Sequence, residues 1–75
     1  MPTSVSVRAH ITGTVWKIEV SVGDAVTEGQ TLVILESMKM EMPVESPAAG
    51  RVSAVLAKEG TSVEEGAVLV ELDPA

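Results

Sequence analysis

The sequence predicts an all-β domain, a flattened antiparallel barrel built from two similar halves. Its apolar residues are mainly valine, with some isoleucine and leucine, and glycines punctuate them, a composition typical of strands and turns. The sequence also repeats itself without a gap at an offset of 50 − 13 = 37 residues. The matched pairs are Gly13 and Gly50, Val15 and Val52, Ile18 and Val55, Gly23 and Gly60, Val26 and Val63, Gly29 and Gly66, Leu32 and Leu69, Val33 and Val70, and Leu35 and Leu72. Two copies of a unit with an apolar face would bury those faces against each other.

Length and composition limit the kind of protein. The chain has 75 residues, room for a single domain over 1–75, and no cysteine to stabilise a small core with disulfides. Its net charge of −6 argues against nucleic acid and anionic membrane surfaces as partners. His10 is the sole histidine, so no histidine cluster suggests a metal site. The N-terminal residues have no signal-peptide pattern, no apolar stretch is long enough to span a membrane, and we expect a cytoplasmic protein.

The first expected strand covers residues 4–9, where alternation places Val5, Val7 and Ala9 on one face. The repeat then predicts, twice, a long strand, a glycine turn, a very short strand, a second glycine turn and a final strand. These halves cover about 13–36 and 50–73. Pairing between the halves gives two small antiparallel sheets with few free edges.

The strand expected over 14–22 contains an irregularity. Strict alternation from Val15 would bury Lys17, although Ile18 has the side chain suited to the core. The phase must therefore slip between Val15 and Ile18, which predicts a β-bulge. We expect Trp16, in this slip, to cover one end of the core, because indole contributes a large buried area.

The two halves are joined by a stretch that differs from the rest of the chain. The apolar runs 31–35 and 42–44 flank a short polar centre, which predicts a hairpin with its turn inside 36–41. Lys39 then lies at the tip, in water, between Met38 and Met40. Exposed methionine side chains contribute little to the stability of a fold, so the pattern indicates that a partner protein recognises them.

The residues around this lysine resemble a known attachment motif. Glu36, Ser37, Met38, Lys39, Met40 and Glu41 are similar to the biotin attachment site of the biotinyl/lipoyl attachment domain family, in its biotin carboxyl carrier type. The likeness is greatest to small stand-alone biotin/lipoyl attachment proteins and covers almost the whole chain. It implies a barrel-sandwich hybrid of two four-stranded sheets with a pseudo-twofold repeat. It also implies covalent biotin on Lys39, and recognition of Glu36, Ser37, Met38, Met40 and Glu41 by biotin protein ligase.

The resemblance implies a carrier and not an enzyme. In the family, the ligase presents biotinyl-adenylate to the lysine, and the carrier then shuttles CO₂ as carboxybiotin between biotin carboxylase and carboxyltransferase sites. The sequence itself has no nucleophile–base pair, metal constellation or phosphate loop. We expect a monomer in isolation that folds without the cofactor.

Two alternatives stay open. Lipoyl domains also place a lysine at the hairpin tip, with an acidic residue three positions before it, as Glu36 is here. An unmodified barrel serving as an interaction module is the other. The two methionines favour biotin.

Overall fold

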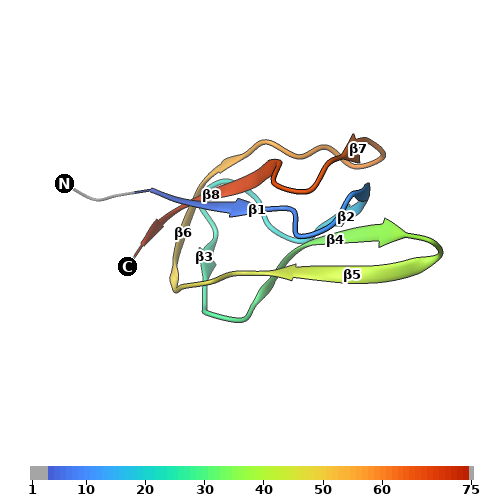
Figure 1. Ribbon diagram of the computed structural model, residues 1–75. Coiled ribbons are helices and arrows are strands. Elements are labelled where there is room, and N and C mark those ends of the chain that lie inside the picture. The colour runs from blue at the N-terminus through green and yellow to red at the C-terminus, as the bar shows by residue number, and fades with distance from the viewer. Residues whose placement is uncertain (1–3, 75) are drawn as a thin grey trace.

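The computed structural model describes residues 4–74, and all of its regular structure is β-strand (Figure 1). Two four-stranded antiparallel sheets have the strand orders β1-β8-β6-β3, here called sheet A, and β5-β4-β2-β7, here called sheet B. This confirms the expected fold class. The strands are β1 (Val5–Arg8), β2 (Gly13–Ile18), β3 (Ala25–Val26), β4 (Thr31–Ser37), β5 (Met40–Glu45), β6 (Gly50–Val55), β7 (Ser62–Val63) and β8 (Val68–Pro74).

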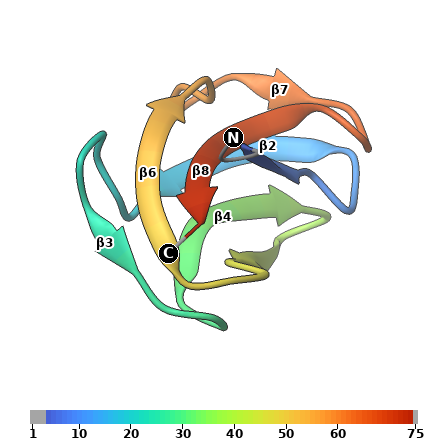
Figure 2. The same cartoon turned by 90° about the vertical axis from the view of Figure 1, so that its left-hand side faces the viewer.

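The short strands are exchanged between the halves of the repeat. β2 pairs with β4 of its own half and also with β7 of the other half. Correspondingly, β6 pairs with β8 and with β3. Each sheet therefore contains strands from both halves, and the chain wraps around one shared core (Figure 2).

The repeat extends further towards the N-terminus than the alignment of the two halves of the sequence indicated. β1 pairs with β8 as β5 pairs with β4, so β1 and β5 are equivalent strands. Val7 of β1 and Val44 of β5, separated by 44 − 7 = 37 positions, are both buried. The two equivalent units are thus β1 to β4 and β5 to β8.

The bulge expected between Val15 and Ile18 is present, and it recurs in the other half. Val15 pairs with Leu35, but Lys17 pairs with Ile34, so Trp16 is the extra residue of β2. In β6 the register shifts in the same way between Val52 and Ala54. Trp16, which was expected to cover one end of the core, is 47% exposed, so about half of its surface stays in solvent.

The strand expected over 14–22 ends at Ile18, because the chain there leaves sheet B and crosses to sheet A. The amide of Gly23 already donates a hydrogen bond to the carbonyl of Val52 in β6, at 2.8 Å. His10 is exposed, as expected for a residue at the rim. Residues 4–74 include no helix of the length and hydrophobicity required to cross a membrane.

The core consists of aliphatic side chains that the repeat supplies in pairs. The largest fully buried side chains are Leu32 and Leu69, Leu35 and Leu72, Val15 and Val52, and Val33 and Val70. Every pair is separated by the repeat offset. The centre of the core is therefore symmetric, and the buried pairs that differ between the halves are Ala9 with Ser46 and Val20 with Ala57.

Candidate functional site

The β4–β5 hairpin projects from one end of the molecule, and the start of β1 and the end of β8 lie at the other (Figure 1). Its pairing runs from Thr31 opposite Glu45 to Ser37 opposite Met40. Between Ser37 and Met40, Met38 and Lys39 form a two-residue turn. The molecule extends 39 × 18 × 17 Å, so the turn is far from the opposite end of the barrel.

The turn has an unusual backbone for its sequence. The φ angles of Met38 and Lys39 are 52° and 65°, the sign pattern of a type I′ hairpin turn. Type I′ turns strongly favour Asn-Gly or Gly-Gly, since a side chain in this left-handed region costs about 1–2 kcal/mol per residue. At the other positive-φ positions within residues 4–74 the chain uses glycine, at 23, 29, 60 and 66. Side chains are thus retained only at this turn, against the backbone preference, which is a mark of a functional site.

Replacing Met38-Lys39 by Asn-Gly is expected to stabilise the domain by about 1–2 kcal/mol, because both residues accept positive φ. Urea unfolding should show a higher midpoint with an unchanged slope. The matched control is Met38→Leu with Lys39→Arg, which keeps two side chains with no preference for this region and should leave the midpoint nearly unchanged. A midpoint no higher for Asn-Gly than for that control would contradict the assignment of strain to this turn.

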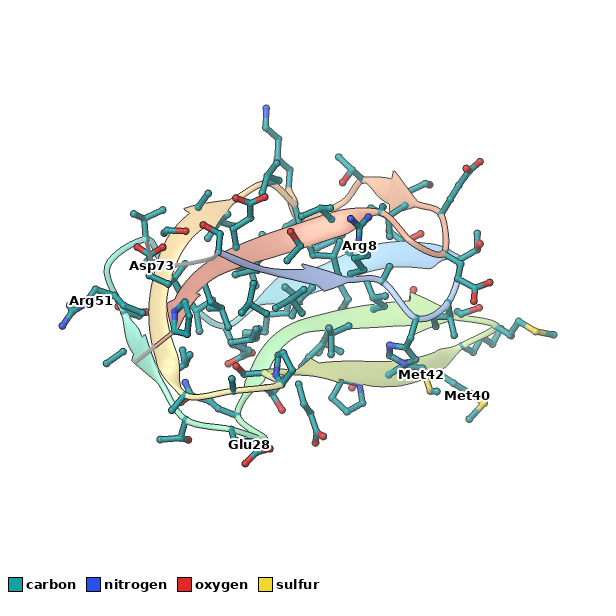
Figure 3. The ribbon with its side chains drawn as sticks, turned by 60° about the vertical axis from the view of Figure 1, so that its left-hand side comes forward. Arg8, Glu28, Met40, Met42, Arg51 and Asp73 are labelled. Carbon is teal, nitrogen blue, oxygen red and sulfur yellow. The ribbon has the colours of Figure 1, made fainter. Side chains whose placement is uncertain are left out.

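The side chains at the tip are in solvent. Met38 is 92% exposed and Met40 62% exposed, and Lys39 is also exposed. Met42, further down β5, is only partly buried, and it and Met40 lie at the hairpin end of the molecule, opposite Arg51 and Asp73 (Figure 3). Within residues 4–74 the one ion pair is that between Lys17 and Glu19, at 3.7 Å, so no carboxylate holds the amine of Lys39.

The hairpin brings together all six residues that the sequence singled out. Ser37 lies opposite Met40, and Glu36 lies opposite Glu41, on the last two pairs before the turn. Both glutamates are exposed. Like charges directly opposite each other destabilise a sheet, so this pair gains nothing for folding.

One residue beside the hairpin, near its tip, was not recognised as part of the site from sequence. Gly13 lies against the end of β4, where a Cβ on it would come within 2.7 Å of the Glu36 carbonyl oxygen and 3.5 Å of the Ser37 Cβ. Glycine therefore lets β2 approach the hairpin closely. The signal was available in the repeat, because Gly50 has the same close approach to the equivalent residue, Asp73.

The geometry suits attachment and not catalysis. Within the described part of the chain there is no group of histidine or carboxylate residues arranged to hold a metal ion. Two surface depressions are lined by residues around Arg51 and Asp73 and by residues of β1 and β5, and neither includes a residue of the turn. What the site offers is one exposed amine, with no ion pair among residues 4–74, on a regularly paired hairpin. Such an amine fits a cofactor that is bound through an amide and is not enclosed.

Comparison with known proteins agrees with this reading. A family model described as "Biotin-requiring enzyme", of the biotin/lipoyl type, matches residues 3–72. The Biotin/lipoyl attachment protein of Bacillus subtilis is 46% identical over 68 residues, which cover 91% of this chain and 93% of that protein. A dihydrolipoyllysine-residue acetyltransferase component of the pyruvate dehydrogenase complex of Azotobacter vinelandii is 44% identical over 63 residues, 84% of this chain but 10% of that protein.

Among solved structures, a single-chain, multi-domain long-chain acyl-CoA carboxylase superposes with a TM-score of 0.92 and 32% identity. The match covers 100% of this chain and 7% of that one. The chain thus spans nearly the whole of one relative and a small part of two larger ones. The family match covers almost every residue and includes the projecting hairpin, and the chain belongs to the biotin/lipoyl attachment domain family.

Proposed function

We propose that this chain is a biotin carboxyl carrier domain and that Lys39 is its attachment residue. The observation that carries the proposal is the two-residue turn in which Met38 and Lys39 keep side chains at positive φ. The backbone preference at that place is for glycine and asparagine. A side chain that is retained against this preference, and that is exposed to solvent, serves a partner.

The attachment step requires little from the carrier beyond presentation. The Nζ of Lys39 attacks an activated carboxyl group of biotin held by biotin protein ligase, forms an amide bond and loses a proton. The ligase must supply the activation and the leaving group, whose bond to the carboxyl carbon breaks as the amide forms. Glu36, Ser37, Met38, Met40 and Glu41 are the residues we propose the ligase recognises beside the lysine.

Once attached, biotin supplies a ring that accepts and releases a carboxyl group. The chain contributes a long tether on a rigid support. Tethering replaces a free encounter by a local one with a raised effective concentration. We propose biotin carboxylase and carboxyltransferase as the two partners whose sites the arm visits, which agrees with the carboxylase found among the solved structures.

The alternative is a lipoyl carrier, which two observations support. Glu36 stands three positions before the lysine, and a lipoyl-bearing protein is among the relatives. Against it, both residues that flank Lys39 are exposed methionines, and the matching family is described by its requirement for biotin. Biotin is therefore the better-supported cofactor. The monomeric state and the cytoplasmic location stay predictions.

The intact mass of the protein purified from its own host tests the proposal. A single added biotinyl group, mapped to the peptide that contains Lys39, is the expected result. An added lipoyl group would establish the alternative. Unmodified protein from cells that express the ligase would contradict both.

A further inference from the structure

The one aromatic residue of the chain is not used in the core. Trp16 is 47% exposed and does not belong to the buried core. Removing apolar surface from water is what stabilises a fold, and the largest apolar side chain here contributes only part of its area. Tryptophan is also among the residues most enriched at the energetic centres of protein interfaces.

Trp16 belongs to an apolar row across the outer face of sheet B. Ile34 of β4 lies directly opposite Pro43 of β5 on one side and Lys17 of β2 on the other, and Trp16 is the bulged residue beside Lys17. Paired residues share a face of a sheet, and the neighbours of Ile34 along β4 point into the core. Trp16 and Lys17 of the bulge lie together opposite Ile34, so Trp16, Ile34 and Pro43 form one row on the outside of the barrel, with Lys17 beside Trp16.

The repeat provides an internal comparison for this row. The residues 37 positions away are Ser53, Glu71 and Ser6, and they are paired in the same way on the outer face of sheet A. There the hydroxyl of Ser53 donates a hydrogen bond to the carbonyl of Glu71, at 3.1 Å. The same backbone, with the same bulge, thus folds with three polar residues in these positions. Folding does not require the apolar row.

The charges around the row differ between the two faces as well. Glu36, Glu41 and Glu45 are exposed on β4 and β5. At the equivalent positions sheet A has Asp73, Ser4 and Arg8. The basic residue beside the row of sheet B, Lys17, is paired with Glu19 at 3.7 Å, so sheet B has an apolar centre whose unpaired border charges are acidic. Such a surface complements an apolar patch bordered by lysine and arginine, and it disfavours a second copy of this acidic chain.

We propose that this surface, the Trp16 face (Trp16, Ile34 and Pro43 bordered by Glu36, Glu41 and Glu45), is where the biotin protein ligase docks. The inference rests on the proposed function and extends the contact from the hairpin tip onto the barrel. Ile34 lies five residues before Lys39 on β4, about 16 Å along the strand. A standard interface covers about 800 Å² per partner, roughly 30 Å across, so one footprint includes both.

The short reach of the unmodified lysine favours the ligase as the partner at the Trp16 face, over the partners that the modified arm visits later. The unmodified side chain has only a four-carbon stem, so the enzyme that acts on it must hold the barrel near the tip. A partner visited by the lengthened arm has no such need. The Trp16 face is on the same sheet as the hairpin and continuous with it through β4 and β5.

The steady-state kinetics of biotin incorporation by the host's ligase test this docking surface. Trp16→Ser and Ile34→Glu each introduce the residue that the equivalent position of sheet A already accommodates, so both should keep the fold, which circular dichroism checks. Each is expected to lower kcat/KM about tenfold or more, through KM, with kcat nearly unchanged. The matched control is Val22→Ser, which removes a side chain that is 64% exposed in a turn packed against β6 of sheet A. Its KM should stay at the wild-type value. For the wild type, KM should rise with added salt.

The outcomes separate this inference from the proposed function. If Trp16→Ser and Ile34→Glu are labelled with the wild-type KM, the proposed docking surface is wrong and the proposed carrier function is unaffected. If the wild-type protein is not labelled at all, the proposed function itself is wrong. If only one variant folds, its KM decides. An unchanged KM together with slower carboxyl transfer would assign the face to a carboxylase component and overturn the proposal. A wild-type dimer that Trp16→Ser abolishes, with KM unchanged, would assign it to a second copy.

Discussion

Lys39→Arg is expected to remove all biotin attachment while the barrel stays folded. The guanidinium keeps the charge and nearly the length of lysine, but it is not deprotonated in proteins and cannot act as the nucleophile. Lys39 contacts nothing in the core, so its replacement should not affect stability beyond a few tenths of a kcal/mol, as for other exposed sites. Streptavidin blotting and intact mass measure attachment, and the urea midpoint measures stability.

The other two lysines provide controls for this experiment. Lys17 lies in β2, and Lys58 lies in the loop after β6. Lys17→Arg and Lys58→Arg should be labelled at the wild-type rate. Biotin on the Lys39→Arg protein would show that the attachment site had been assigned to the wrong residue.

Exchanging the two residues of the turn should nearly abolish attachment even though a lysine remains at the tip. The double substitution Met38→Lys with Lys39→Met leaves composition, net charge and local hydrophobicity unchanged. Both positions have positive φ, so after the exchange the same two residue types still occupy the left-handed region of the turn. However, the two central residues of a tight turn project in different directions, and modest misplacement of a nucleophile can cost about a hundredfold in rate. We expect a loss of this order in the initial rate of biotin incorporation.

The control for the exchange is Met38→Leu, which changes the flanking side chain but keeps the lysine at position 39. It should be labelled much faster than the exchanged protein. Should the exchanged protein be labelled as fast as the wild type, the ligase would recognise a lysine near methionines and not a position in the turn.

The core could be read from the sequence because it follows the repeat. Glycines and branched aliphatic residues recur at one offset, and the eight largest fully buried side chains are four pairs at that offset. The bulge was also predictable, because the alternation that Val15 begins would otherwise bury Lys17. These features depend on local backbone geometry and on hydrophobic period, both of which are encoded residue by residue.

The position of Lys39 at a hairpin tip was likewise predictable, since two apolar runs flank a short polar centre. The strain in that turn was not, because the sequence does not give φ, and Met-Lys is not a turn signature. The closeness of Gly13 to Glu36 also required the structure, since it arises between strands that are distant in sequence.

What the sequence by itself determined was the fold class, the repeat, the core and the one lysine set apart from the rest. Tertiary structure decided which strands exchange between the halves, that Trp16 lies outside the core, and that sheet B alone carries an apolar row with an acidic border. The physical reason is that burial of a periodic apolar residue follows from its own position in the pattern. The exposure of a bulged residue, and its neighbours across the sheet, depend on which strands come to lie beside it.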